Sequence, residues 1–428
     1  MEEAQLNRSL TWIQGTAMAI GAVLGSGVLV LPALTAEQAG PGSIWVWVGM
    51  SVLAFPLALT IGRLGARFPH AGGIVEYARL AFGPRTGQIT GWLFIGTIPI
   101  GVPIIALIGA NYVEKSFFMP SWSISLMASL MLVLSLYLNV RGVELAGWVQ
   151  IFLLILIALV MLTAVLAAMP DVRLASFHPW IAHGWAQLGK SAVIIFWCFV
   201  GWEMVAHLAE EFRHPSQDLR RTFTLAPAVV GILYVGLSFV TVGAHAYGGA
   251  DQGAPLSQLV GMGLGRIGSI MTGAIAFLIT VVAIHGNVTG FSRMVYAQAR
   301  NGDFPAILAK LHPRYQTPIV ALVALGIDFA VVLTIYIVFH INLSILIKWP
   351  SVVFLVIYII AMASAIRLFN EERGAKWMAA IPLILCVTLY PFSGWAGVYP
   401  LILAAIGWGI SHKKSGKGRR STWMGKRS

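Results

Sequence analysis

The sequence predicts an all-α integral membrane protein with twelve transmembrane helices. Its 428 residues are 58% hydrophobic and only 10% charged, whereas soluble domains contain roughly 25% charged residues. The apolar residues gather in twelve segments of about the length that a spanning helix needs, about 20 residues. Two of these segments, the first and the sixth, are interrupted by glycine at matching positions. The segments are, in order, 10–36, 42–66, 88–113, 122–140, 145–169, 188–211, 223–247, 265–292, 317–339, 343–367, 376–391 and 395–411.

The basic residues orient these segments in the bilayer. With the N-terminus in the cytoplasm, most of the 28 lysines and arginines fall on the inner side. Those in the outer regions are Lys115, Arg173, Lys190, Arg266 and Lys348. This asymmetry follows the positive-inside rule, so both termini are expected to be cytoplasmic. It also explains the net charge of +12 without a nucleic-acid partner. The basic tail, 412–428, is expected to anchor the topology and to contact anionic membrane lipid.

The first segment is interrupted at its middle, where Gly25, Ser26 and Gly27 stand together. Glycine is a poor helix former, so the backbone is expected to unwind there. Unwinding at that depth exposes N–H and C=O groups, which is costly in hydrocarbon unless something binds them. Gly21 and Gly25 also have the GxxxG spacing of a helix-packing surface, which is the alternative interpretation.

Two cytoplasmic links, 68–92 and 292–318, are moderately apolar but are not read as further spans. The first is rich in glycine, and the second contains Asn301-Gly302 and three prolines, which mark turns. We expect both to be amphipathic or re-entrant stretches packed at the inner face. GLGRIG, at 263–268, matches a dinucleotide-binding pattern, but it follows no soluble strand, so that function is rejected.

The sixth segment reads AVIIFWCFVGWEMVAHLAEEF, with Gly201 at its middle and Glu203 two residues later. Five segments separate this break from the break at Gly25, and an odd number of spans inverts the second copy. Two interrupted segments at matching positions of two halves indicate the central site of a transporter. The chain is therefore interpreted as one transmembrane domain. Its parts are a first inverted repeat at 10–169, a second at 188–367 and two extra helices at 376–411.

Four motifs make the chain recognisable. They are GSGVLVLP, FPHAGGIVEYARLAFG…GW, FWCFVGWE…EFRHPSQD and SRMVYAQARNGDFP. Together, over essentially the whole chain, they resemble the amino acid–polyamine–organocation superfamily. The FWCFVG and AHLAEEF stretches are most similar to the bacterial YjeH-type exporters of methionine and branched-chain amino acids. The resemblance implies the LeuT-type fold, alternating access and a multi-pass location in the bacterial cytoplasmic membrane.

The broken helices can bind both ends of an amino acid zwitterion. The half-helix that starts near Ser26 offers free N–H groups and a positive dipole end to an α-carboxylate. The ends of the preceding half-helices offer free carbonyls to an ammonium. The resemblance places Ser26 and Gly27 at the carboxylate, and the carbonyls of Val23, Trp197 and Val200 at the ammonium. The predicted substrate-binding residues are Val23, Leu24, Gly25, Ser26, Gly27, Trp197, Val200, Gly201 and Trp202.

The surroundings of the breaks predict the substrate class. Leu24, Trp197, Phe199 and Trp202 are apolar, and the only acid there is Glu203. This composition favours a neutral, hydrophobic amino acid such as methionine, leucine, isoleucine or valine over a cationic one. The predicted function is proton-driven export, with uptake or exchange as the alternative. An intramembrane enzyme and a non-transporting sensor are the rivals from other classes. The first would need an acid or histidine constellation, and the second a signalling domain.

Glu203 is the predicted coupling and gating residue. A carboxyl group buried in the membrane can carry a proton, and the superfamily carries a glutamate at this point. The alternative is a structural hydrogen bond to neighbouring backbone. A sodium site between the first and eighth segments would need hydroxyl ligands on the eighth, where Thr280 and Thr289 are available. Asp328 is expected to pair with a neighbouring helix, and His207 and His285 to be core side chains. No cofactor or metal is expected, and the protein is expected to be a monomer or homodimer.

Overall fold

The structure is a computed structural model that describes residues 10–25, 27–70, 72–142, 147–206, 212–248, 254–300 and 302–410. Every regular element in these residues is a helix, apart from one isolated bridge between Leu10 and Phe212. The predicted all-α membrane fold is confirmed. The basic tail 412–428 and His207 lie outside the described residues.

The helices follow the predicted segments closely. In chain order they are α1 (Trp12–Val23), α2 (Gly27–Ala39), α3 (Ser43–Arg67), α4 (Gly73–Phe82), α5 (Pro84–Ile95), α6 (Ile98–Phe117), α7 (Trp122–Val140), α8 (Gly147–Ala168), α9 (Trp185–Ile195), α10 (Trp202–Ala206), α11 (Pro215–Gly243), α12 (Pro255–Arg300), α13 (Ile319–Phe339), α14 (Leu343–Leu368), α15 (Arg373–Leu389) and a helix at 398–410. Short 3-10 turns between them are η1 (Gly40–Gly42), η2 (Met169–Asp171), η3 (Leu174–Phe177), η4 (Phe196–Phe199), η6 (Ala306–Ala309) and η7 (Tyr390–Gly397).

Ten helical stretches among the described residues are long and apolar enough to cross a membrane. Two of the ten join two predicted segments, although the first of these contains only the second half of the segment 10–36, whose first half is the shorter apolar helix Trp12–Val23. Gly27–Arg67 joins α2 to α3 through η1, and Arg373–Ile410 joins α15 to the helix at 398–410 through η7. All twelve predicted segments are therefore helical, which establishes a multi-pass membrane protein.

Several boundaries differ from the sequence prediction. The seventh segment, predicted to begin at 223, begins at Pro215. The eighth, predicted to begin at 265, begins at Pro255 and is kinked at Gly265 (φ 61°, ψ −155°). The third segment is two helices, because Gly96 and Thr97 form a turn between α5 and α6. The eighth segment continues past residue 292 to Arg300, since MVYAQAR consists mainly of good helix formers. Gly302, with φ 76°, follows the end of this helix. The link 68–92 contains α4, whose one buried face includes Ile74, Tyr77 and Ala78, and the first part of α5.

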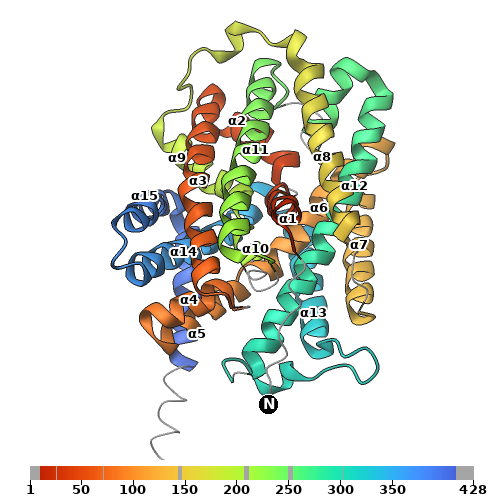
Figure 1. Cartoon of the computed structure of the whole chain (residues 1–428). Coiled ribbons are helices and arrows are strands. Elements are labelled where there is room, and N and C mark those ends of the chain that lie inside the picture. The colour runs from red at the N-terminus through yellow and green to blue at the C-terminus, as the bar shows by residue number, and fades with distance from the viewer. Residues whose placement is uncertain are drawn as a thin grey trace, which may run out of the picture.

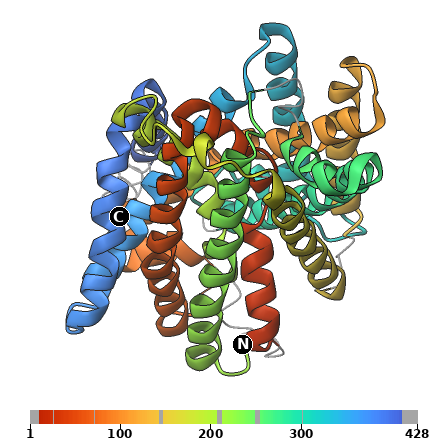
Figure 2. The ribbon, with the colours of Figure 1, turned by 90° about the horizontal axis from the view of Figure 1, so that it is seen from above.

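The discontinuous helices occupy the middle of the bundle. Figure 1 shows α1 and α10 at the centre, with α15 at one edge and α7 at the other. The view from above in Figure 2 keeps the same order. α1 contacts α8, α10 and α11, while α2 contacts α9, α11 and α12. Large apolar side chains remain exposed on α7, α8 and α13, as expected of helices that face lipid.

Candidate functional site

The first helix break lies between α1 and α2. Thr11 and Gln14 form a capping box that starts α1. The helix ends at Val23, and Leu24 leaves helical geometry at φ −70° and ψ 40°. α2 resumes at Gly27. Gly25 is thus non-helical, as the sequence predicts, and Leu24 is non-helical as well, whereas Gly27, also predicted to unwind, is the first residue of α2. Ser26 lies outside the described residues. The predicted contact between Ser26 and a carboxylate stays a prediction.

The second break lies between α9 and α10. The chain tightens into η4, extends at Val200 (φ −94°, ψ 148°) and turns at Gly201 before α10 begins. Gly201 has φ 127°, a conformation that side chains other than glycine rarely adopt. The predicted interruption at Gly201 is therefore present, and its cause is the backbone geometry that glycine alone allows without strain.

The two breaks touch each other through glycine. A Cβ atom on Gly27 would lie 2.7 Å from the Cys198 sulfur, so the start of α2 packs directly on η4. A Cβ atom on Gly201 would lie 2.7 Å from the Ala22 carbonyl oxygen, so the second break packs on the last turn of α1. The sequence separates these residues by more than 170 positions, and the fold brings them into contact.

Tyr234 of α11 holds the two breaks together. Its hydroxyl lies 2.8 Å from the Val23 carbonyl oxygen and 3.0 Å from the Cys198 carbonyl oxygen. A hydroxyl has one proton, so it donates to these two carbonyls alternately. Sequence reasoning missed Tyr234. The available signal was a phenol in the middle of an apolar span, where a polar group needs a partner.

A second phenol ties α2 to its surroundings. The Tyr112 hydroxyl of α6 donates to the Leu29 carbonyl and accepts from the Leu256 N–H at 3.1 Å. At the other end of the broken helix, the Leu10 carbonyl accepts from the Arg213 N–H at 2.9 Å. Both halves of the first broken helix are therefore fixed to neighbours outside the break.

Glu203 is buried, with 3% of its surface exposed. One oxygen, Oε2, accepts hydrogen bonds from the Gly201 N–H at 3.0 Å and from the Tyr358 hydroxyl of α14. A carboxylate in the first turn of α10 also interacts favourably with the helix dipole. The alternative role for Glu203 was a structural hydrogen bond to neighbouring backbone, and the bond from the Gly201 N–H is such a hydrogen bond. Tyr358, a second partner, was not anticipated from the sequence.

The predicted site residues differ in accessibility. Gly25, Trp197 and Val200 are partly exposed, whereas Val23, Leu24, Gly27, Gly201 and Trp202 are buried. The partly exposed set contains main chain from both breaks and one indole. Of the predicted site residues in the described part of the chain, these three are the ones that are not fully buried.

An aromatic wall lies next to the junction. The Trp197 ring lies 6.0 Å from the Phe354 ring, between centroids, and packs so close to Gly101 that a Cβ atom there would lie 2.7 Å away. Phe199 lies 5.2 Å from Tyr234 and 6.2 Å from Trp47. Trp202 packs against Phe223, and its indole N–H has no partner within the described part of the chain. The surroundings are apolar, as the sequence predicts.

The other polar residues singled out from the sequence form hydrogen bonds away from the junction, apart from one oxygen of Asp328. His285 lies 3.1 Å from the Asn139 amide, whose oxygen accepts from Thr289 at 2.6 Å. The Thr280 hydroxyl donates to the carbonyl of Ala276, one turn earlier in its own helix. His285 is therefore a bonded core side chain, as expected. The expected partner of Asp328 is not found at its Oδ2, which has none among the described residues.

The described residues hold no group of three or more histidine, cysteine or acidic side chains that could bind a metal ion. The two cysteines, Cys198 and Cys386, are free and buried, and they share no disulfide. The described part of this centre consists of main-chain groups at helix ends, one buried carboxyl group and aromatic side chains.

We expect Tyr234→Phe to lower stability by about 1–3 kcal/mol, because the variant leaves buried carbonyls at both breaks without their donor. Thermal unfolding of the purified protein measures the change. Tyr137→Phe is the matched control, because the Tyr137 side chain is 52% exposed on α7. Equal melting temperatures for the two variants would show that the Tyr234 hydroxyl does not stabilise the junction.

Comparisons with known proteins assign the chain to a family. A family model described as amino acid permease matches residues 10–414. The amino acid permease YecA of Bacillus subtilis is 45% identical over 412 residues, which cover 96% of this chain and 97% of YecA. The L-methionine/branched-chain amino acid exporter YjeH of Escherichia coli is 32% identical over 413 residues, again 96% and 97% of the two chains. The branched-chain amino acid permease BcaP of Bacillus subtilis is 26% identical over 347 residues, 74% of this chain and 73% of BcaP.

These relatives are named as permeases and exporters, not as enzymes, and the matches span the whole helical bundle. The resemblance that the four sequence motifs carry is therefore confirmed at the level of the superfamily and of the YjeH-like group. The chain belongs to the amino acid permease family of the amino acid–polyamine–organocation superfamily.

Proposed function

We propose that this permease exports neutral, hydrophobic amino acids, namely methionine, leucine, isoleucine and valine, by proton antiport. The observation that carries the proposal is the contact between two broken helices at the centre of the bundle. Opposite helix ends meet there, so the ends of an amino acid zwitterion find complementary charge. The names of YjeH and BcaP, which refer to methionine and branched-chain amino acids, support the substrate class.

The substrate carboxylate binds the main-chain N–H of Gly27 at the start of α2, together with that of Ser26, whose role rests on the sequence prediction alone. The ammonium binds the carbonyls of Val23, Trp197 and Val200. Tyr234 leaves lone pairs on the Val23 carbonyl, so the same oxygen accepts a second hydrogen bond. Trp197 and Phe354 receive the apolar side chain. A guanidinium or an amine in that position would lose its hydration without a carboxylate partner, which excludes cationic substrates.

Glu203 couples transport to protons in this scheme. As a carboxylate it accepts from Gly201 and Tyr358 and so ties α10 to α14. Protonation removes the negative charge from both hydrogen bonds and weakens the tie. The second helix break then moves relative to α14. The two five-helix repeats, 10–169 and 188–367, move against each other, so that the site opens alternately to the two sides of the membrane. Both termini lie in the cytoplasm of a bacterial cell.

A liposome efflux assay tests the function. Purified protein is reconstituted, the vesicles are loaded with radiolabelled leucine or methionine, and efflux is followed with and without an acidic exterior. We expect the acid exterior to accelerate efflux of both amino acids, and expect no efflux of labelled lysine. Efflux that ignores the pH gradient but needs sodium or external amino acid would replace proton antiport with the alternative mechanisms. Binding without any movement would favour a sensor.

An ion pair at the predicted cytoplasmic end is expected to hold the inner side closed. Arg79 of α4 lies 3.0 Å from Asp303, and Gln88 of α5 donates to the Asp303 carbonyl at 3.3 Å. We expect Asp303→Ala to favour the inward-open state about fivefold, the equivalent of about 1 kcal/mol. Alkylation of the buried thiol of Cys198, in a Cys386→Ala background, measures the opening.

Glu372→Ala is the matched control for this change. It removes the partner of Arg67. Both side chains are about half exposed, so this ion pair contributes little to stability. Alkylation of Cys198 should therefore stay at the wild-type rate in this control. The same rate in Asp303→Ala would contradict the assignment of the Arg79–Asp303 pair to closure.

A further inference from the structure

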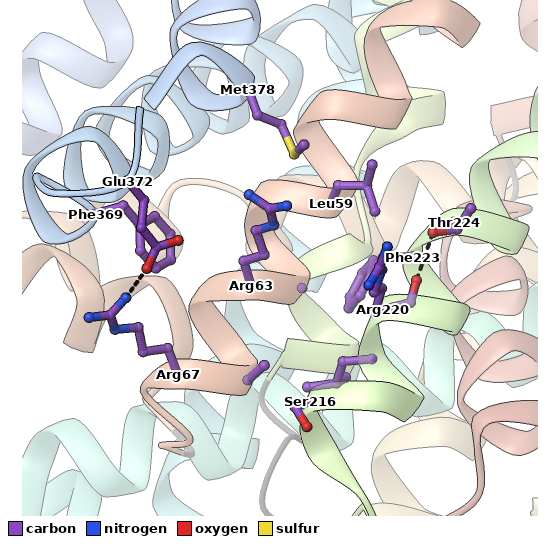
Figure 3. Close-up of a pocket in the computed structure, with 13 residues that line it drawn as sticks. Leu59, Arg63, Arg67, Ser216, Arg220, Phe223, Thr224, Phe369, Glu372 and Met378 are labelled. Atoms are coloured by element: carbon purple, nitrogen blue, oxygen red, sulfur yellow. Dashed lines mark hydrogen bonds and ion pairs between the residues drawn. The ribbon is translucent and has the colours of Figure 1, made fainter. Parts of the chain in front are cut away.

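A groove lies away from the helix junction, at the predicted cytoplasmic end of the bundle. It has a volume of about 580 Å³ and is formed by the end of α3, the start of α11 and the connection from α14 to α15. Figure 3 shows the side chains that line it. The volume lies within the range of small-molecule sites, roughly 300–1,000 Å³. The proposed transport cycle gives this groove no role.

The basic side chains that line the groove outnumber its acidic side chains. Arg63 and Arg67 reach it from α3, and Arg220 reaches it from α11 (Figure 3). Arg67 pairs with Glu372, the acidic residue of the lining. Arg63 and Arg220 form no ion pair with any of the residues that the structure describes. Two guanidinium groups therefore face the groove with their charge unneutralised.

The remaining lining is apolar in its larger side chains. Leu59 lies one helical turn before Arg63 on α3, and Phe223 lies three residues after Arg220 on α11. Phe369 and Met378 close the groove from the side of α14 and α15. The second predicted span ends at 66 and the seventh begins at 223. The arginines therefore lie at the membrane boundary, and the apolar side chains lie toward the membrane interior. A charged end next to an apolar end is the character of a phospholipid.

We propose that this groove binds an anionic phospholipid. The guanidinium groups of Arg63 and Arg220 bind the phosphate diester, and an acyl chain lies along the partly exposed Leu59 and Met378. Guanidinium donors match phosphate oxygens in a planar, bidentate geometry. Basic pockets between helices on the cytoplasmic side are suited to anionic headgroups. A free phosphate ion would use the arginines but would gain nothing from the apolar side chains.

The bound lipid would contact the helix that holds the junction together. Phe223 of the groove packs against Trp202 of α10, with ring centroids 6.4 Å apart. Tyr234 lies on the same helix, α11, three turns further along. A lipid in the groove therefore touches the element that joins both breaks. Anionic lipid is expected to change the melting temperature through this helix, independently of the substrate.

Native mass spectrometry of the full-length protein in detergent tests the proposal. Phosphatidylglycerol is titrated against wild type and against the double variant Arg63→Gln, Arg220→Gln. Each arginine near a lipid surface contributes about fivefold in affinity, so we expect the double variant to bind about 25-fold more weakly. Arg85→Gln with Arg314→Gln is the control. It removes the same charge from exposed arginines outside the groove, and we expect no comparable loss.

Three further titrations identify the ligand. Phosphatidylcholine, a zwitterion, should bind at least several-fold more weakly than phosphatidylglycerol. Soluble glycerol phosphate should not displace the lipid, and Met378→Gln should weaken lipid binding without changing binding of glycerol phosphate. Equal loss in the groove variant and the control variant would overturn the site. Displacement by glycerol phosphate at equal concentration would overturn the lipid and assign a soluble phosphate instead.

Discussion

Replacement of Gly201 by alanine is expected to slow transport tenfold or more. The residue has φ 127°, where a Cβ atom is strained, and that atom would lie 2.7 Å from the Ala22 carbonyl oxygen. A backbone oxygen cannot rotate away as a flexible side chain can, so the two breaks must separate. We expect the rate of leucine efflux from liposomes to fall tenfold or more, since such strain costs about 1–3 kcal/mol.

Gly49→Ala provides the control for this prediction. Gly49 is exposed within α3, and a Cβ atom there would meet no other atom within 4 Å. Alanine is favoured over glycine inside a helix by about 1 kcal/mol, so this variant should be as stable as wild type or more so. Normal efflux by a folded Gly201→Ala protein would show that contact between the breaks is not needed for transport.

Replacement of Glu203 by glutamine is expected to uncouple efflux from protons. Glutamine keeps an acceptor for the Gly201 N–H but carries no exchangeable charge. We expect acceleration by an acidic exterior to disappear, a change of tenfold or more because hydrogen bonds to a charged group contribute about 1.5–3 kcal/mol. Exchange of internal labelled leucine for external leucine should continue, because Glu203 is not among the residues proposed to bind the substrate carboxylate and ammonium. Radiolabel efflux measured in both modes separates the two effects.

Two variants complete this test. Glu114→Gln changes another buried glutamate, 8% exposed and near the end of α6, and should keep the response to pH. Tyr358→Phe removes one donor to Glu203 while the carboxyl group stays, so it should weaken the response without eliminating it. Undiminished acceleration by acid in Glu203→Gln would transfer proton coupling to another residue.

The sequence was sufficient to predict the all-α membrane fold, the helical segments and the breaks at Gly25 and Gly201, because those features depend on local composition. Runs of apolar residues define spans, and Gly25 and Gly201 interrupt them whatever surrounds them. The division of the third segment at Gly96 and the extension of α12 to Arg300 were missed, because a turn or a helix end depends on packing as well as on propensity. Glycine at 27 was predicted to bind substrate through its amide. Its second role, close packing on Cys198, needs the fold.

The partners of the site could not be predicted from the sequence. Tyr234, Tyr112 and Tyr358 lie on three different helices, and each donates to a residue of a broken helix far away in the chain. A lone phenol in an apolar span signals a need for a hydrogen bond, but it does not name the acceptor. The same holds for Asn139 and His285, whose contact joins α7 to α12.

The three phenols have a consequence for how the protein responds to ionic strength. They fix the helix breaks through uncharged donors, two of them to carbonyl oxygens. Mobile ions screen exposed charges over about 10 Å at 0.1 M salt but have little effect on buried, neutral hydrogen bonds. The contacts at the centre should therefore keep their strength from dilute to concentrated saline. The Arg79–Asp303 pair, partly exposed at the end of the bundle, should weaken over the same range. Salt would thus loosen the Arg79–Asp303 pair, the proposed inner gate, while the centre of the bundle stays intact.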